Sequence, residues 1–248
     1  MKIDRDNVLQ DLAPDGRIRA AINFGNPVLA QKDPQTGQAQ GVSVDLAHEL
    51  GRRLGVPVEL VTFDAAVKVF EALKTAAWDV AFLAIDPVRA AEISFTSPYV
   101  LIEGTYVVRE DSPLRSIADF DREGVRIAVG RGAAYDHFLR RSLKHAQLVS
   151  ADTSPGALEL FLDQGLDAAA GVKQPLVEFA QRHPGLRVIE GRFTAIEQAM
   201  GTPKQRAAGS KYLTHFIEEM KACGFVASAL ARSGQHDAAV APPLRHRD

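Results

Sequence analysis

Short apolar segments alternate with helix-like segments along this chain, and no other feature limits the fold as strongly. In one of the helix-like segments Leu46, Leu50 and Leu54 recur every four residues and form an apolar face, and Gly55 ends the helix. Strands that alternate with helices favour a parallel sheet with helices on both faces. In chain order the predicted elements are strand 18–24, the helix that ends at about 54, strand 56–63, helix 65–75 and a strand that ends at 85.

The alternation begins again after residue 123, behind a long extended segment, 99–109, that is rich in β-forming residues. The sequence therefore predicts two α/β units. The tail at about 207–233 is predicted to be strongly helical, and the residues after Gly234 are predicted to be frayed. The predicted elements of the second unit are strands 124–129, 146–149, 167–172 and 186–189, with helices up to 143, at 155–164 and at 174–182.

The segment after the apolar run 80–85 carries the first functional signal. Asp86 and Pro87 are suited to the N-cap and first position of a helix. Arg89 then falls in the first turn, where the helix dipole disfavours a cation. An anionic ligand would compensate this charge, and an ion pair of Arg89 with Asp86 or Glu92 is the alternative.

Arg89, together with the segment Phe95-Thr96-Ser97-Pro98-Tyr99, resembles the extracellular solute-binding protein family 3, the substrate-binding proteins of amino-acid ABC transporters. In that family an arginine after a buried strand holds the carboxylate of the ligand, which suits the planar guanidinium group. Asp86 stands where the family usually has threonine, and an ionised Asp86 would repel a carboxylate. The resemblance implies a carboxylate ligand, an amino acid or a related organic acid, whereas Asp86 argues against the usual α-amino acid.

The resemblance covers nearly the whole chain and implies an α/β fold of the periplasmic binding protein type 2 kind. This fold is a two-lobed clamshell, in which each lobe is a mostly parallel sheet flanked by helices. Two extended crossover strands join the lobes, and the ligand cleft lies between them and closes by hinge motion. The implied lobes are 1–103 with 199–248, and 104–198.

The resemblance also implies the other ligand-binding residues. Backbone N–H groups of a glycine-bounded turn meet the carboxylate of the ligand at a helix N-terminus. Two interpretations stay open for Asp86, which either caps its helix or binds the ligand, and for Phe24, which either covers the ligand or packs in the core. The predicted ligand-binding residues are Arg89, Asp86, Ala84, Phe24, Asn26, Phe63, Gly132, Ala133, Ala134, Tyr135 and Lys173.

Lys173 stands in a segment, 167–175, that resembles the part of the family that supplies an acid to the α-ammonium group of the ligand. In this chain no acid stands in the positions after Ala170, and Lys173 and Gln174 are the polar residues there. If Lys173 faces the ligand, the site gains a second cation and prefers a dianionic or non-amino acid. The alternative is an ordinary surface lysine.

Composition excludes several other classes of function. A net charge of −2 and the lack of a basic run speak against nucleic-acid binding, and no stretch approaches the roughly 18 apolar residues of a membrane span. The single cysteine, Cys223, allows neither an internal disulfide nor a cysteine-cluster metal site, and is predicted to be a small core residue. Histidine spacing gives no metal motif. We therefore expect no metal, no cofactor and no direct insertion into a membrane.

The predicted function is a monomeric, non-catalytic solute-binding protein that captures its ligand by closure and passes it to the membrane permease of an ABC transporter. The resemblance places it in the periplasm. The first ten residues lack the apolar stretch of a secretory signal, which leaves a mature form or a cytoplasmic protein open. The alternatives are a cyclohexadienyl dehydratase-like enzyme, with Asp86 or Glu197 as a buried general acid, and a cytoplasmic ligand-binding protein on the same fold.

Overall fold

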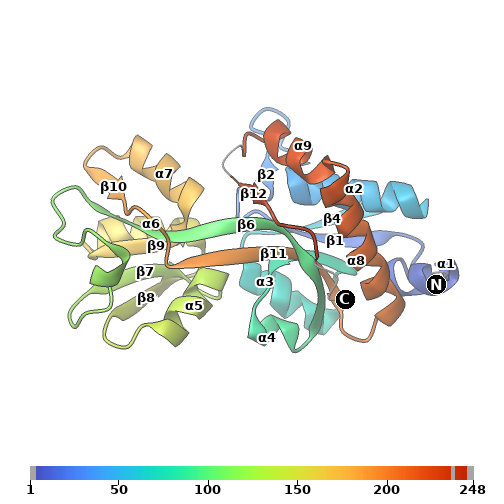
Figure 1. The fold of residues 1–248 in the computed structure, drawn as a ribbon, viewed down its shortest axis with the longest axis horizontal. Helices are drawn as coiled ribbons and strands as arrows, with labels where there is room; N and C mark the ends of the chain where they lie inside the picture. Colours follow the sequence, from blue (N-terminus) through green and yellow to red (C-terminus); the bar gives the residue numbers. More distant parts are fainter. Residues whose placement is uncertain (1–3, 236–237, 245–248) are drawn as a thin grey trace. The chain divides into compact units, whose positions relative to one another are not determined.

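A computed structural model describes residues 4–235 and 238–244, and the chain in it divides into two compact units (Figure 1). Unit 1 consists of residues 1–101 and 197–248, and unit 2 consists of residues 102–196. The predicted fold class, α/β with sheets flanked by helices, is confirmed. The chain ends 1–3 and 245–248 of the predicted lobe 1 lie outside the described residues.

Unit 1 is built on three parallel strands in the order β4-β1-β5, with part of β11 antiparallel to β5. Helices α2 and α3 both pack against β1 and β4. The elements are α1 (Arg5–Leu12), β1 (Ile18–Asn23), β2 (Gln31–Lys32), β3 (Ala39–Gln40), α2 (Val42–Leu54), β4 (Val58–Phe63), α3 (Ala66–Glu71), a 3-10 turn (Ala72–Thr75), β5 (Val80–Ala84) and α4 (Pro87–Ala90).

Trp78 lies in the core of unit 1, as its place at the start of a strand predicts. It is wholly buried with Val69, Ala81 and Ile93, and its indole Nε1 donates a hydrogen bond to the carbonyl of Val69 at 2.8 Å. Because this polar atom is satisfied inside the core, the large ring is buried without an unpaired donor. Through Val69, Trp78 connects α3 with the core of unit 1.

A buried ion cluster connects the first strand of unit 1 with the C-terminal part of the same unit. Asp79 accepts hydrogen bonds from Arg19 Nε at 2.9 Å and from Arg206 NH1 at 2.7 Å, and the backbone N–H of Arg19 also donates to it. Arg206 in addition donates to the carbonyl of Asp11. One carboxylate thus connects parts of the chain that are 127 residues apart.

Unit 2 repeats the alternating pattern, with parallel strands in the order β9-β7-β8 and β6 antiparallel to β9. Strands β6 and β11 each belong partly to both units. The elements are β6 (Ile93–Arg109), a 3-10 turn (Ile117–Asp119), β7 (Arg126–Gly130), α5 (Ala134–Ser142), β8 (Gln147–Ala151), α6 (Ser154–Asp163), β9 (Ala168–Val172), α7 (Lys173–Arg182), β10 (Leu186–Val188) and β11 (Thr194–Pro203).

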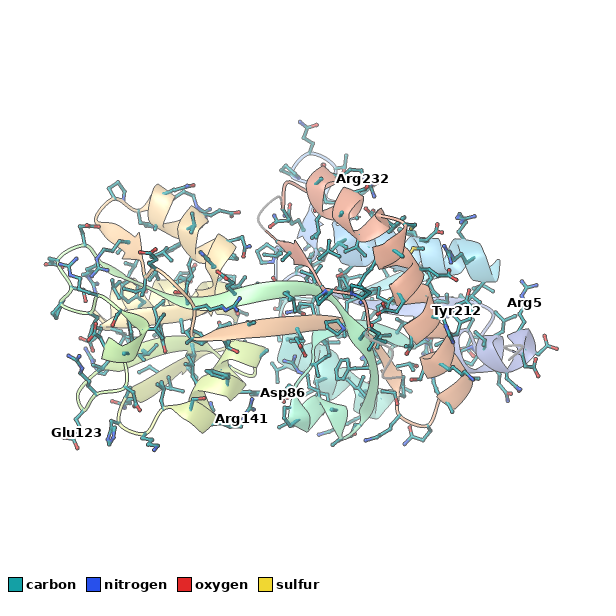
Figure 2. The ribbon with its side chains drawn as sticks, viewed as in Figure 1. Arg5, Asp86, Glu123, Arg141, Tyr212 and Arg232 are labelled. Carbon is teal, nitrogen blue, oxygen red and sulfur yellow. The ribbon has the colours of Figure 1, made fainter. Side chains whose placement is uncertain are left out.

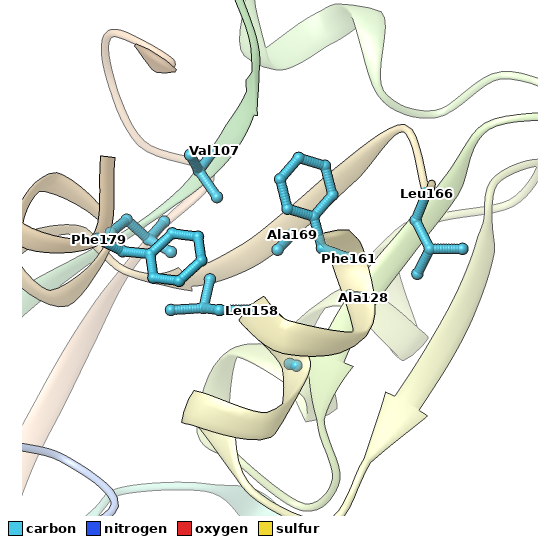
Figure 3. Packing of buried hydrophobic residues seen from close by; sticks show 9 residues of the cluster. Val107, Ala128, Leu158, Phe161, Leu166, Ala169 and Phe179 are labelled. Carbon is cyan, nitrogen blue, oxygen red and sulfur yellow. The ribbon is translucent and has the colours of Figure 1, made fainter. Parts of the chain in front are cut away.

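The core of unit 2 forms where α6 and α7 cover the sheet (Figure 3). Phe161 and Phe179 project from the two helices, and small side chains on the strands, Ala128 and Ala169, leave room for them. Large residues on helices against small residues on strands give a close-packed interior. This packing fixes where the first turns of the helices lie relative to the strand ends.

The C-terminal part agrees with one prediction and corrects two. The predicted helical tail 207–233 consists of two helices, α8 (Ala207–Ala222) and α9 (Phe225–Arg232), and Gly224 with a φ of 79° lies between them. Cys223 is exposed at the end of α8 and is not a core residue. The segment after Gly234 is not simply frayed, since β12 (Ala239–Val240) pairs antiparallel with Val100 and Leu101 of β6. Among the described residues no helix is long and apolar enough to cross a membrane.

Candidate functional site

The carboxyl ends of the strands of unit 1 bring its predicted site residues to one edge of the sheet. Strands β1, β4 and β5 are parallel, and Asn23 at the end of β1 pairs with Phe63 at the end of β4. The segments that follow these strands therefore start at the same edge of the sheet. They are residues 24–26 after β1 and residues 85–89 after β5. Open α/β sheets bind their ligands at this edge.

Arg89 is buried at this edge, with 1 % of its surface exposed. Its NH1 donates a hydrogen bond to the carbonyl of Ala84, the last residue of β5, at 3.1 Å. Burial lowers the pKa of Arg89 to about 10, and the charge of Asp86 acts in the opposite direction. The guanidinium group is still charged at neutral pH, so unit 1 holds a cation in a place where a charge is costly.

Asp86 is the N-cap of α4, as the Asp-Pro pair predicts (Figure 2). Its Oδ1 accepts a hydrogen bond from the backbone N–H of Val88 at 2.9 Å, and only 2 % of the residue is exposed. Glu92, the other candidate partner of Arg89, is exposed. The capping role of Asp86 is confirmed, and a contact of Asp86 with the ligand stays a prediction.

Phe24, Asn26 and Phe63 are half-buried in the same unit, the first two after the end of β1 and Phe63 at the end of β4. Phe63 packs partly against the core around Trp78, and Lys32 Nζ lies 5.1 Å from the centre of the Phe24 ring. The side-chain Oδ1 of Asn26 is buried without a hydrogen-bond partner. A buried acceptor of this kind is suited to a donor group of a ligand.

In unit 2 the predicted turn after β7 is present and leads into α5. Gly132 has a φ of 70°, a conformation that glycine adopts without strain, and its N–H donates to Asp136 Oδ2 at 2.9 Å. Ala133 is the N-cap and supplies no side-chain cap to the helix, which starts at Ala134. Backbone N–H groups of the first turn of α5 are therefore the donors that this segment offers to an anion.

Tyr135 holds this turn to the neighbouring loop. Its buried hydroxyl accepts a hydrogen bond from the N–H of Gly130 at 3.0 Å and donates to Ser154 Oγ at 2.9 Å. Burial raises the pKa of the Tyr135 hydroxyl, so it stays protonated. These bonds give Tyr135 a role in positioning the turn, and its direct contact with a ligand stays a prediction.

Lys173 is the first residue of α7 and is paired with an acid. Its Nζ donates to Glu103 Oε2 at 2.9 Å, and Arg192 NH1 lies 3.2 Å from Glu103 Oε1. The hydrogen bond from Lys173 holds the pKa of the Glu103 carboxyl below its usual range. Lys173 is 41 % exposed along its side chain and is paired with Glu103, and its contact with a ligand stays a prediction.

Sequence reasoning did not find Glu103, Arg192 or Gln174 as site candidates. Glu103 lies 70 residues from Lys173, and only the antiparallel register of β6 with β9, in which Gly104 pairs with Val172, brings the two together. Gln174 Oε1 is a second buried oxygen without a hydrogen-bond partner. No spacing in the sequence marks such an atom, because its surroundings depend on tertiary packing.

Replacing Asp86 with Thr tests its influence on Arg89. Threonine also caps a helix, so we expect Asp86→Thr to fold normally. The loss of a negative charge beside Arg89 should raise the affinity for a simple carboxylate by about 3- to 10-fold, measured by calorimetric titration. An unchanged affinity would mean that Asp86 acts as a helix cap alone.

The two α/β units, each with its predicted binding residues after the carboxyl ends of parallel strands, define a solute-binding protein by fold. The chain belongs to the bacterial extracellular solute-binding proteins, family 3, which match residues 18–234. It is 19% identical over 214 residues to a glutamine-binding protein of Geobacillus stearothermophilus. The alignment covers 84% of this chain and 81% of that protein.

Solved structures agree on the fold. The solute receptor for L-cysteine of Neisseria gonorrhoeae is similar with a TM-score of 0.79 and 24% identity, over 91% of this chain and 93% of that one. An ancestral amino acid-binding protein described as a precursor of cyclohexadienyl dehydratase has a TM-score of 0.76 and 22% identity, over 90% of this chain and 98% of that one. At these identities the likeness establishes the fold.

Proposed function

We propose that this protein captures a small carboxylate-bearing metabolite, an amino acid or a related organic acid, and that Arg89 binds the carboxylate. The observation that carries the proposal is the burial of a charged guanidinium group at the edge of the sheet where α/β proteins bind ligands. Its NH1 is oriented by the carbonyl of Ala84, the residue that ends β5. The position of the cation is thus set by the strand itself.

The energetics favour an anionic ligand. Taking a guanidinium group out of water is costly, and the lowered pKa of Arg89 records this cost. A ligand carboxylate that accepts two parallel hydrogen bonds would offset it, since charge-assisted bonds are about twice as strong as neutral ones. Asn26 Oδ1 would accept from a donor group of the same ligand.

Unit 2 supplies a second set of groups suited to an anion. The first turn of α5 presents backbone N–H groups behind Gly132, and Tyr135 fixes the turn. We propose this turn as a ligand-binding segment, as the resemblance implies. A variant that blocks its N–H groups should therefore weaken the binding of an anionic ligand.

Membership of the family supports the biological setting of this proposal. The family consists of extracellular solute-binding proteins. We propose that the protein works as a monomer on the outer side of the cytoplasmic membrane and delivers its ligand to the permease of an ABC transporter. It carries out no reaction on the ligand.

The dehydratase-like alternative gains no support from the candidate acids. Glu197 is exposed, whereas a general acid of raised pKa needs a buried site. Asp86 is buried, but its Oδ1 accepts the hydrogen bond that caps α4. Binding without catalysis therefore fits these residues better.

A thermal-shift screen of the purified protein tests the proposed function. A ligand that binds only the folded protein raises the melting temperature, because at 100 times its dissociation constant it adds about 2.7 kcal/mol to the free energy of unfolding. We expect shifts with small mono- or dicarboxylates and none with their methyl esters, sugars or polyamines. A shift with polyamines or sugars but with no carboxylate would contradict the proposal.

A further inference from the structure

The C-terminal segment 239–244 has no part in the proposed function, and we call it the strap. It comes after the residues that match the family, which end at 234. Its first two residues form β12, which pairs antiparallel with Val100 and Leu101 of β6 (Figure 1). The backbone N–H of Ala241 then donates to the carbonyl of Tyr99 at 3.0 Å. The strap therefore follows β6 backbone to backbone from Tyr99 to Leu101.

A buried lysine on α8 fastens the strap to β6. Lys221 has only 3 % of its side chain exposed. Its Nζ donates to the carbonyl of Pro98 in β6 at 3.1 Å and to the carbonyl of Pro242 in the strap at 3.0 Å. A salt bridge to Glu218 Oε1 at 2.6 Å adds a third partner, and an ammonium group has three donors. One side chain thus connects β6, the strap and α8.

Glu218 repeats this connection at the end of the strap. Its Oε2 accepts a hydrogen bond from the backbone N–H of Leu244 at 3.1 Å, and the hydroxyl of Ser97 in β6 donates to its Oε1. The last residues of a domain are usually poorly ordered unless other parts of the fold hold them. In this chain the two charged side chains of α8 hold the strap against β6.

The contact of the strap with β6 ends at the boundary between the two units. Leu101 is the last residue of unit 1 on this strand, and unit 2 begins at Ile102. In unit 2 the pairing of β6 with β9 begins at Gly104, which is opposite Val172. Ile102 and Glu103 therefore lie between the ladder that the strap forms in unit 1 and the ladder of unit 2.

We propose that the strap is a conformational device, which holds β6 to unit 1 as far as Leu101 and confines the bending of this strand between the units to Ile102 and Glu103. Without the strap, the segment that bends begins earlier in β6 and the units move over a wider range. Backbone that is free before binding has to be ordered on binding, which lowers affinity. This last consequence rests on the proposed function, in that the units close on a ligand.

Spin labels on the two units measure the range of their movement without any ligand. The labels are placed at Glu71→Cys in unit 1 and Gln181→Cys in unit 2, both exposed positions, in a Cys223→Ser background. A chain that ends at Gln235 lacks the strap, and Lys221→Met removes its fastening from the full chain. We expect both changes to broaden the distribution of label-to-label distances by about 1.5-fold or more.

Two matched controls keep the strap and its fastening. A chain that ends at Leu244 retains segment 239–244, and Lys74→Met removes an exposed lysine elsewhere in unit 1. Both should give the distance distribution of wild type, and circular dichroism checks that every variant folds. A distribution that stays as narrow as in wild type, in the folded chain that ends at Gln235 and in folded Lys221→Met, would overturn the inference.

Calorimetric titration tests the consequence for binding. The probe is the mono- or dicarboxylate with the largest thermal shift, and we expect Lys221→Met to bind it about 3- to 10-fold more weakly than wild type and Lys74→Met do. Equal affinities would overturn the effect of the strap on binding. A screen in which no carboxylate shifts the melting temperature would contradict the proposed function, and the distances between the spin labels then decide the inference alone.

Discussion

Arg89→Met should weaken the binding of the carboxylate ligand by about 100-fold or more. Removing one partner of a desolvated, hydrogen-bonded charge pair costs about 2–5 kcal/mol of binding free energy, and 1.4 kcal/mol corresponds to a factor of ten. Arg89→Lys keeps the charge but loses the planar pair of donors, so we expect an intermediate loss of about 10-fold or more. Calorimetric titration of the ligand found by the screen measures both.

The control for this experiment is Arg52→Met, because Arg52 lies on α2 with 71% of its side chain exposed. The affinity of Arg52→Met for the ligand should equal that of wild type. Arg89→Met removes the cation beside the buried carboxylate of Asp86, so its melting temperature without ligand should fall, and circular dichroism checks that the variant folds. A folded Arg89→Met protein with wild-type affinity would refute the assignment of the site.

The largest effect on stability is expected for Asp79→Ala. The carboxylate of Asp79 is wholly buried between Arg19 and Arg206, and its removal leaves both cations without their partner. Breaking a buried ion pair in this way costs about 3–5 kcal/mol of unfolding free energy, which chemical denaturation would measure. Asp64→Ala is the control, because its exposed pair with Lys68 should contribute less than about 1 kcal/mol.

The same carboxylate predicts how stability depends on pH. Burial acts to raise the pKa of Asp79, but hydrogen bonds from Arg19 and Arg206 outweigh it and lower the pKa below its usual value. The unfolded chain therefore binds a proton at Asp79 more readily than the folded chain does. This stabilisation is present above about pH 4, the ordinary pKa of aspartate, and is lost as the pH falls through the lower folded value. Asp79→Ala should flatten the fall in stability on acidification, and an equally steep fall would contradict this account.

Local rules account for the parts of the fold that were predictable. The Asp86-Pro87 pair identifies the start of α4, and Gly55 with a φ of 69° ends α2. The errors lie where tertiary contacts decide. The pairing of β12 with Val100 and Leu101 joins segments that are far apart in the sequence, and no local pattern predicts it. Cys223 follows the apolar spacing of a helix that in fact ends at Ala222, so its side chain is exposed.

The candidate site divides in the same way. Arg89 could be found from the sequence because a cation in the first turn after a buried strand is unusual by itself. The ion pair of Lys173 with Glu103 could not, since it depends on the register of β6 with β9. Asn26 is expected at the site only through the resemblance, and the buried oxygen of Gln174 has no sequence signal, because any amide looks alike until its neighbours are known.

A comparison of an acid with its amide decides whether Arg89 binds the carboxylate of the ligand. The best ligand from the screen and its primary amide, which has the same shape without the charge, would each be titrated into wild type and Arg89→Met. Wild type should prefer the acid over the amide by about 100-fold, and Arg89→Met should prefer it by less than about 3-fold. An equal preference for the acid in both proteins would show that the carboxylate is bound elsewhere.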